Sequence, residues 1–269
     1  VGNATITDTH EAQARYDLVT AQEIAARNDL EVRNRALEQL IGRAAPGLAL
    51  LGKRFTLQPP DPSSMESWVE QARSLSLQVR IALENLNFST LDVRRNRGAH
   101  HPTLDAYATV SESSSGSGTQ GGAGTETSSK VVGLQLAIPL YQGGAISSRV
   151  REAIANEDRA RQDLENARRS AELAARQGYL GVTSGIAQVR ALEAALVSNQ
   201  SSLDSTRLGQ EVGVRTQVDV LNAQQQLFSA RRDLAQARYN YILSLLRLKA
   251  AAGQLGETDL ERVNSWLDK

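Results

Sequence analysis

Hydrophobic residues recur along this chain at two different spacings, which predict long helices interrupted by one pair of strands. Small and apolar residues recur every three or four positions over 144–207 and again up to Gly253, as they do on one face of a helix. Over residues 103–111 apolar residues instead alternate with polar ones, as in a strand with two different faces. The chain is therefore expected to be mainly helical with one β-hairpin.

The two predicted strands lie within residues 102–141. One face of the first strand carries Leu104, Ala106, Ala108 and Val110, and one face of the second carries Val132, Leu134, Leu136, Ile138 and Leu140. Between them, residues 111–130 read "SESSSGSGTQGGAGTETSSK", with no hydrophobic residue able to anchor the segment. The pattern predicts a hairpin with an apolar stripe and a solvated loop.

Each of the two longest predicted helices carries a stripe of small or apolar residues. In the last long helix the stripe is Val220, Ala223, Leu227, Ala230, Leu234, Ala237, Tyr241, Leu245 and Leu248. In the helix before it, the stripe is Val150, Ala153, Ala160, Leu164, Ala167, Ala171, Ala174, Gly178 and Gly181, interrupted by the charged Glu157. Such a repeat predicts coiled-coil packing, in which alanine and glycine allow the helix backbones to approach closely.

Composition excludes several functions. Thirty basic and thirty acidic residues cancel, so no global field would attract nucleic acid. No apolar run approaches the roughly 20 residues of a membrane-spanning helix, although a barrel strand needs only about 9–11 residues. No acidic cluster accompanies His10, His100 or His101, so solvated side chains are favoured over a metal site. No catalytic or cofactor motif is present, and neither an enzyme nor a cofactor is expected.

The beginning of the chain repeats a later segment at an offset of 211 residues. Both copies start at Val-Gly, at Gly2 and Gly213, and both stop at a glycine, at Gly42 and Gly253. Each copy is then the final helix of a repeat unit. A first unit of the same length would place about 170 further residues ahead of Val1, so the chain is expected to be a fragment.

Three stretches carry a family resemblance: "HPTLDA", "GLQLAIPLYQGG" and "VGVRTQVDVLNAQQQLFSARRDLAQARYNYILSLLRLKAAAG". With them the chain resembles the TolC family of outer-membrane efflux ducts. The resemblance implies a homotrimer in the Gram-negative outer membrane, with coiled-coil helical hairpins that cross the periplasm and continue into strands of one shared β-barrel. It also implies contacts with the lipid bilayer, a periplasmic adaptor (membrane fusion) protein and an inner-membrane efflux pump or ABC exporter.

The same resemblance divides the chain and places its surfaces. It implies the last helix of a first repeat at 1–42, an equatorial link at 43–63, a helix at 64–97, a membrane hairpin at 102–141 with an extracellular loop at 111–130, a periplasmic helical hairpin at 142–253 and an equatorial C-terminal segment at 254–269. The residues expected to face the membrane are Leu104, Val110, Leu134, Leu136, Ile138 and Leu140. Adaptor contacts are expected at Gly209, Val212 and Gly213.

A gate is the sharpest functional expectation from the resemblance. It assigns Arg215 to a bond across helices and Asp219 to a ring that constricts the pore, with Thr7 and Asp8 as partners in the first repeat. Two departures from the family pattern, Asn222 in place of a second ring aspartate and Gln210 in place of a tyrosine, imply a thinner acidic ring and a weaker latch. The alternative interpretation is that these are ordinary charges at helix starts, where acids complement the helix dipole.

Two other functions would also use long helices. A structural coiled-coil protein without a channel would need only the helices, and the alternating hairpin with its long loop argues against it. An elongated periplasmic adaptor would need additional domains rich in short strands, which the sequence lacks.

Overall fold

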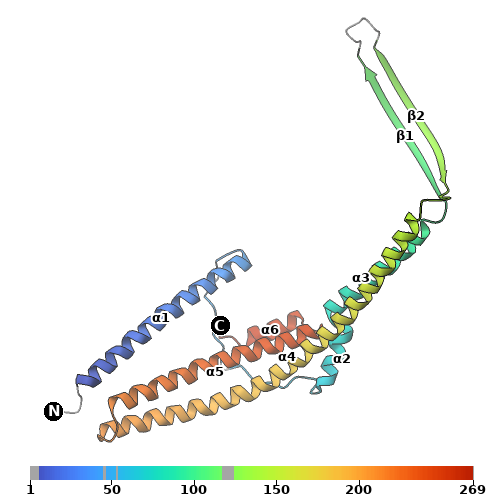
Figure 1. The fold of residues 1–269 in the computed structure, drawn as a ribbon. Coiled ribbons are helices and arrows are strands. Elements are labelled where there is room, and N and C mark those ends of the chain that lie inside the picture. Colours follow the sequence, from blue (N-terminus) through green and yellow to red (C-terminus); the bar gives the residue numbers. More distant parts are fainter. Residues whose placement is uncertain (1–5, 45–46, 53, 117–123, 269) are drawn as a thin grey trace. The chain divides into compact units, whose positions relative to one another are not determined.

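The computed structural model describes residues 6–44, 47–52, 54–116 and 124–268. The elements, in chain order, are α1 (Ile6–Ile41), α2 (Met65–Leu75), α3 (Leu77–Gly98), β1 (Thr103–Ser115), β2 (Thr125–Ala137), α4 (Ala145–Glu211), α5 (Gln217–Ala251) and α6 (Glu257–Ser265) (Figure 1). They form two compact units, one from residues 1–76 with 171–269 and one from residues 77–170. The predicted mainly helical fold with one β-hairpin is confirmed.

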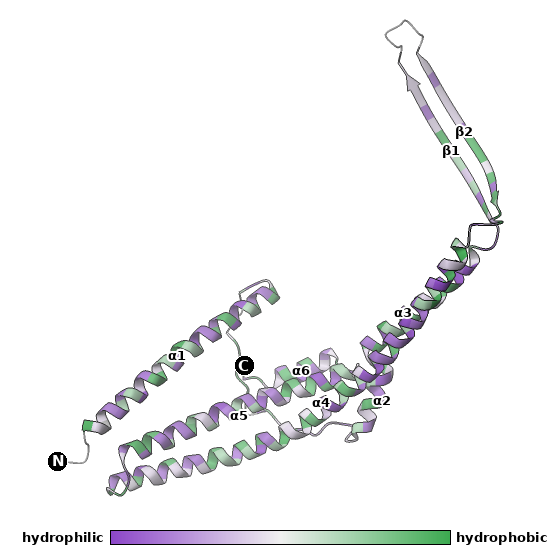
Figure 2. Cartoon of the chain, in the orientation of Figure 1, coloured by the Kyte–Doolittle hydropathy of each residue, from purple (hydrophilic) through white to green (hydrophobic). Residues whose placement is uncertain are grey.

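In the first unit, α5 pairs with the second half of α4 along an apolar seam. Buried side chains repeat along α5 at alternating steps of three and four residues, and they are Val220, Ala223, Leu227, Ala230, Leu234, Ala237, Tyr241 and Leu248. This is the predicted stripe except for Leu245, which is only partly buried. Green and purple residues accordingly alternate along both helices in Figure 2. The coiled-coil prediction is confirmed for α5.

The stripe predicted for α4 is only partly right in its second half. Ala171 is buried as predicted, but Ala175 and Val182 are buried instead of the neighbouring Ala174 and Gly181, and the buried positions continue to Val189 and Leu203. The reason is that α4 has two partners, because its first part belongs to the unit of α3 and its second part to the unit of α5. One heptad register cannot serve both partners, so the apolar stripe shifts along the helix.

Glycine brings α4 close to α5 at one point. A Cβ atom added to Gly178 would lie 3.0 Å from Cα and 3.2 Å from Cβ of Leu248. Leu248 is fully buried at this contact. The prediction that a small residue permits close backbone approach is therefore confirmed at Gly178.

Aromatic residues close the first unit at the far end of α5. Trp68 of α2, Tyr241 of α5 and Trp266 are buried in one cluster, against which Phe55 packs. The Phe55 ring stands edge-on to those of Tyr241 and Trp266, with centroids 5.9 and 5.5 Å apart. The predicted link 43–63 and the C-terminal segment thus share one core, and Leu51 and Leu267 form a β-bridge between them.

The helix predicted over 64–97 is interrupted. It breaks into α2 and α3 at Ser76, which is buried and has an extended backbone, with φ −55° and ψ 132°. Gly253 occupies the space beside the break, because a Cβ atom there would lie 2.3 Å from the carbonyl oxygen of Leu75. With φ +68°, Gly253 also ends α5 in a conformation that favours glycine. The break is a tertiary feature, which explains why local sequence does not show it.

The strands are longer than the alternating pattern predicts. Thirteen residue pairs join β1 to β2 in antiparallel register, from Thr103 opposite Ala137 to Ser115 opposite Thr125. Much of the predicted loop 111–130 is therefore strand, since main-chain hydrogen bonds need no apolar side chains and serine and threonine suit an exposed ladder. Residues 117–123 of that loop lie outside the described residues.

The expectation that no segment resembles a membrane-spanning helix was wrong for α4. Within the described chain it is the one helix long and apolar enough to cross a membrane by length and composition, with a mean hydropathy of 1.2 over 18 residues. Leucine, valine, isoleucine and alanine raise this value, and polar residues between them prevent a continuous apolar run. A core helix passes the same test, and α4 buries Val182 and Val189 completely in clusters shared with α5. We therefore assign α4 to the coiled coil.

Candidate functional site

The turn between α4 and α5 is built on two glycines with different roles. Gly213 adopts φ +79°, a left-handed conformation that ends α4 cheaply. The carbonyl oxygen of Gly209 accepts hydrogen bonds from the backbone N–H groups of Val214 and Arg215, at 2.8 and 3.1 Å. A Cβ atom at Gly209 would lie 2.7 Å from Cγ of Arg215, so a glycine here lets the arginine stem cross the helix end. Val212 and Val214 remain exposed.

Asp219 closes the first turn of α5 as one half of a capping box. Its Oδ2 accepts from the backbone N–H and the hydroxyl of Thr216 at 2.9 and 3.0 Å, while its own N–H donates to Thr216 Oγ1 at 3.2 Å. The backbone and side-chain hydrogen bonds from Thr216, with a smaller attraction from Arg215, lower the pKa of the Asp219 carboxyl. In the chain by itself, Asp219 therefore serves the helix start.

The other predicted gate residues lie at the α4–α5 turn and at the start of α1. Arg215 is exposed and makes no ion pair with Asp219. Thr7 lies exposed in the first turn of α1. Asp8 belongs to the same turn, and its side chain lies outside the described part of the structure. The gate assignment of Arg215, Asp219, Thr7 and Asp8 stays a prediction.

A bond that the sequence analysis missed joins α1 to α5 near this turn. Arg15 Nη1 donates to Asn222 Oδ1 at 2.7 Å, across 207 positions of sequence. Asn222 was noted only as a departure from the family pattern. The sequence offers one signal for this partner. Asp8 matches Asp219 in the repeat, and Arg15 is a basic residue two helical turns after Asp8.

A second polar link crosses the α4–α5 seam farther from the turn. Arg238 Nη2 lies 2.7 Å from Glu193 Oε1, and the guanidinium carbon of Arg238 lies 5.9 Å from the centre of the Phe55 ring. The residue that matches Arg238 in the repeat, Arg27, pairs with Glu23 on its own helix at 2.7 Å. Both pairs are partly exposed, so neither stabilises the fold by more than about 1 kcal/mol.

The β-hairpin presents a wholly exposed apolar face. Register places Leu104 opposite Leu136, Ala106 opposite Leu134 and Ala108 opposite Val132, so these parts of the two predicted stripes share one face. The prediction was wrong for Ile138 and Leu140, because β2 ends at Ala137 and both residues follow the paired strand. Leu134 is 73% exposed and Val132 is 85% exposed. Figure 2 shows these green positions in the part of the strands nearest the helices, with paler and purple residues beyond.

The opposite face of the hairpin is polar and closely packed at one pair. Tyr107 lies opposite Gly133, and a Cβ atom on that glycine would lie 2.7 Å from the tyrosine ring. The aromatic ring thus covers the glycine backbone across the strand pair. Asp105 and Gln135 form the neighbouring pair on this face. One face of the hairpin therefore suits hydrocarbon and the other suits water.

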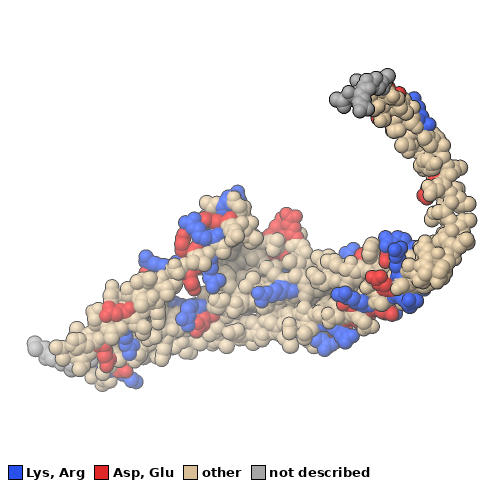
Figure 3. All heavy atoms as spheres, turned by 45° about the horizontal axis from the view of Figure 1, so that its top comes forward, with Lys and Arg blue, Asp and Glu red and all other residues tan. Residues whose placement is uncertain are grey.

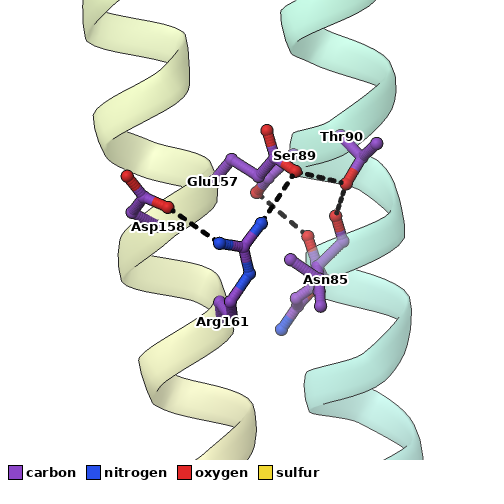
Figure 4. Close-up of polar contacts among 7 residues, drawn as sticks. Asn85, Ser89, Thr90, Glu157, Asp158 and Arg161 are labelled. Carbon is purple, nitrogen blue, oxygen red and sulfur yellow. Dashed lines mark hydrogen bonds and ion pairs between the residues drawn. The ribbon is translucent and has the colours of Figure 1, made fainter.

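Glu157, the charged residue in the predicted α4 stripe, has a partner on α3. Thr90 Oγ1 donates to Glu157 Oε1 at 3.2 Å, and Arg161 reaches the same oxygen at 3.5 Å (Figure 4). Arg161 also pairs with Asp158 at 3.1 Å. A satisfied polar contact inside a helix seam fixes the register of the two helices, and we assign Glu157 that structural role.

Residues 68–254 match the model of one protein family, described as outer membrane efflux protein. The match covers well over half of the chain. The chain belongs to the outer membrane efflux protein family. The family name places its members in the outer membrane, so the predicted resemblance and location are confirmed.

Curated relatives of this efflux protein match nearly all of its sequence. Outer membrane protein TolC of Escherichia coli is 39% identical over 279 residues, which cover 100% of this chain and 56% of the relative. The alkaline protease secretion protein AprF of Pseudomonas aeruginosa is 36% identical over 264 residues, covering 97% and 54%. The efflux protein chain thus spans little more than half the length of these relatives.

A solved structure shows the same fold. The crystal structure of a membrane protein from Pseudomonas aeruginosa superposes with a TM-score of 0.72 over 96% of this efflux protein chain and 58% of that chain, at 21% sequence identity. The likeness bears on the fold alone. It supports the arrangement of long helical hairpins with a two-stranded hairpin between them.

Within the described ranges of the efflux protein, no group of three or more histidine, aspartate or glutamate side chains is arranged to hold a metal ion. The polar residues described above make structural contacts or lie at the α4–α5 turn. The features that remain for function are an exposed apolar β-face, a turn with exposed valines, and one side-chain bond between α1 and α5.

Proposed function

We propose that this chain is part of one protomer of a trimeric export duct in the Gram-negative outer membrane. In this proposal β1 and β2 are two strands of a shared barrel, and α4 and α5 line a passage through the periplasm. The duct is passive, because it offers a path and performs no chemistry on the substrate. AprF is named for the secretion of a protease, which supports export as the class of function.

The exposed apolar face of the hairpin is the observation that carries this proposal. A two-stranded sheet leaves backbone donors and acceptors unpaired along both outer edges, and lipid tolerates no such edges. The hairpin therefore needs further strands on each side, which other parts of the full-length protein and other protomers would supply. The fully apolar rungs run from Leu104–Leu136 to Ala108–Val132 and span about 14 Å along the strand, part of the apolar band of roughly 25 Å in membrane barrels, and Val110 extends the face opposite Lys130.

We place the gate at the turn between α4 and α5. Arg215, Asp219, Thr7 and Asp8 are its proposed residues, and Arg15 with Asn222 adds a bond between α1 and α5. Opening then separates and untwists these helices. A periplasmic adaptor would contact the exposed turn at Gly209, Val212 and Gly213, and an inner-membrane efflux pump or ABC exporter would supply the substrate. The geometry of the turn supports this by leaving Val212 exposed.

The duct is tested on the full-length protein. We expect it to require detergent for solubility, to have the mass of a trimer, and to form channels in planar bilayers. In that assay, Arg215→Ala should raise the closed-state conductance, because the variant cannot form the bond across helices that we propose for this arginine. Arg207→Ala, also exposed and close to the end of α4, is the matched control and should leave the conductance unchanged.

The two parts of the proposal fail differently. Unchanged closed-state conductance in the Arg215→Ala protein would remove the latch but leave the duct. A full-length protein that is monomeric and soluble without detergent would refute the duct and return the non-channel coiled-coil protein as the better description.

A further inference from the structure

Five arginines gather where the helices of the second unit meet the β-hairpin. They lie in the last two turns of α3 and the first two turns of α4, and we call them the arginine collar: Arg94, Arg95, Arg97, Arg149 and Arg151. All five are exposed. Figure 3 shows blue Lys and Arg atoms massed on this part of the helices.

The collar keeps most of its charge. Arg95 pairs with Asp92 at 2.6 Å, whereas the other four form no ion pair with any residue that the structure describes. Asp92 on α3 and Glu152 on α4 are the acidic residues within these helix ends. The collar with Asp92 and Glu152 therefore has a net charge of +3, given by five arginines and two acids.

Charge is distributed unequally about the apolar face. β1 begins five residues after α3 ends, so the collar borders the apolar face on the side of Leu104 and Leu136. On the other side, the described strands carry Glu112 and Glu126, and Lys130 is their one basic residue. Cations thus concentrate at a single border of the face that we assign to lipid.

We propose that the arginine collar binds the phosphate groups of anionic phospholipids in the periplasmic leaflet of the outer membrane. This rests on the proposed membrane position of the hairpin. Headgroups lie at the border of the hydrocarbon layer, where long arginine side chains reach them, and a guanidinium can donate two hydrogen bonds to one phosphate. Each arginine near an anionic surface strengthens binding by about fivefold at most.

The arrangement fits a membrane surface better than one small anion. Arg95 and Arg149 line a shared groove with Asn96 and Glu152. Arg151 lies two residues beyond Arg149, which places it on the other side of the helix. The guanidinium groups are spread around two helices at one border of the apolar face instead of converging on one pocket, as contacts with many separate headgroups require.

The test uses the full-length protein in phosphatidylcholine vesicles that contain traces of spin-labelled phosphatidylglycerol or spin-labelled phosphatidylcholine. The measured quantity is the ratio of the two labels immobilised at the protein surface. We expect a preference for phosphatidylglycerol of at least threefold, which 0.5 M salt should weaken because its Debye length is only about 4 Å. Replacing Arg94, Arg97, Arg149 and Arg151 together by glutamine should bring the ratio close to one.

A matched variant controls for lost charge in general. Four exposed arginines farther along the helices also form no ion pair within the described part of the chain: Arg169, Arg176, Arg190 and Arg247. Their joint replacement by glutamine removes the same charge and should leave the preference intact. Replacing the four collar arginines by lysine keeps the charge and should retain a salt-sensitive preference, which serves as the test if the glutamine variant does not assemble.

Three results would overturn the collar. One is an inserted wild-type protein with no preference, and another is an equal loss in the collar and control variants. The third is displacement of the labelled phosphatidylglycerol by inorganic phosphate but not by chloride at equal ionic strength, which would indicate a site for soluble anions. A wild-type protein that never enters the vesicles refutes the proposed duct instead.

Discussion

The helical hairpin α4–α5 buries its apolar side chains within the chain, whereas the strand hairpin β1–β2 leaves its apolar side chains exposed. Tyr241 and Leu248 are fully buried in the helical seam, whereas Leu134 and Val132 on the strands are 73% and 85% exposed. A helix satisfies its backbone within itself, so one partner helix is enough to bury its apolar stripe. A strand pair satisfies only its inner edges and leaves an apolar face without a partner in this chain.

This difference indicates which part of the molecule depends on its surroundings. The α4–α5 seam is complete within a single chain, so changes there should alter the stability of the chain itself. The apolar face of the hairpin packs against nothing within the chain. Changes on this face should therefore leave the stability of the isolated chain unaffected and reduce only insertion into the membrane. The four predictions below test this division in order of decreasing effect.

The largest effect is expected from Leu134→Arg, near the middle of the apolar face. Arginine at the middle of a bilayer costs about 2–4 kcal/mol per barrel substitution. We expect the full-length variant to be nearly absent from the outer membrane, as measured by the amount of trimer recovered from isolated membranes. The control is Gln135→Arg, one residue along on the opposite face, which should assemble normally.

Equal loss in both arginine variants would contradict the assignment of faces, because the hairpin would then have no lipid side. The helical fold should not change in either case, since neither residue contacts a helix seam. Far-ultraviolet circular dichroism of the purified variants would check this.

A smaller effect is expected from Tyr241→Phe in the helical seam. The Tyr241 hydroxyl donates to the carbonyl oxygen of Gln58 at 2.8 Å and accepts from the Gln58 N–H at 2.9 Å. Removing it should lower the free energy of unfolding by about 1 kcal/mol. Urea denaturation measures the change, and Tyr239→Phe, on the more exposed side of the helix, should have no effect.

The same tyrosine predicts a pH dependence. Burial raises the pKa of the Tyr241 phenol, a rise that the Gln58 N–H partly opposes. The folded state therefore favours the neutral phenol, and this contribution is complete below the unfolded pKa of about 10. Stability should fall as the pH rises above that value toward the higher folded pKa. The Tyr241→Phe protein should lack this part of the decline.

Helix periods were predictable from the sequence where one helix meets one partner. The α5 stripe was predicted almost completely, because its 3.5-residue repeat serves a single seam. The α4 stripe shifted by one residue because that helix changes partner, and the break at Ser76 was missed because Gly253, far along the chain, occupies the adjacent space. Both errors arise from tertiary contacts that no local pattern encodes.

In the candidate site, too, local patterns were predictable and tertiary contacts were not. Alternation predicted the apolar face of the hairpin, since a period of two assigns side chains to faces without further information. The capping role of Asp219 was open to sequence reasoning and was the stated alternative. The bond from Arg15 to Asn222 was not, because it depends on how α1 approaches α5.

The smallest effect, and the sharpest comparison, is expected from Asn222→Asp. Arg15 now donates to a neutral amide, and a carboxylate would make that bond charge-assisted and roughly twice as strong. An exposed pair contributes at most about 1 kcal/mol, so the closed state should gain up to roughly fivefold in population. Single-channel recording of the full-length protein should show fewer spontaneous openings.

A double-mutant cycle separates this latch from the added negative charge. In an Arg15→Gln background the new aspartate has no cation to hold, yet it still adds to an acidic ring near Asp219. If Asn222→Asp reduces openings only when Arg15 is present, the bond between α1 and α5 holds the closed state. If it reduces them equally in both backgrounds, the added carboxylate acts through the charge of the pore. The bond between α1 and α5 would then contribute nothing to the closed state, and α1, like the strand hairpin, would lack a stabilising partner within this chain.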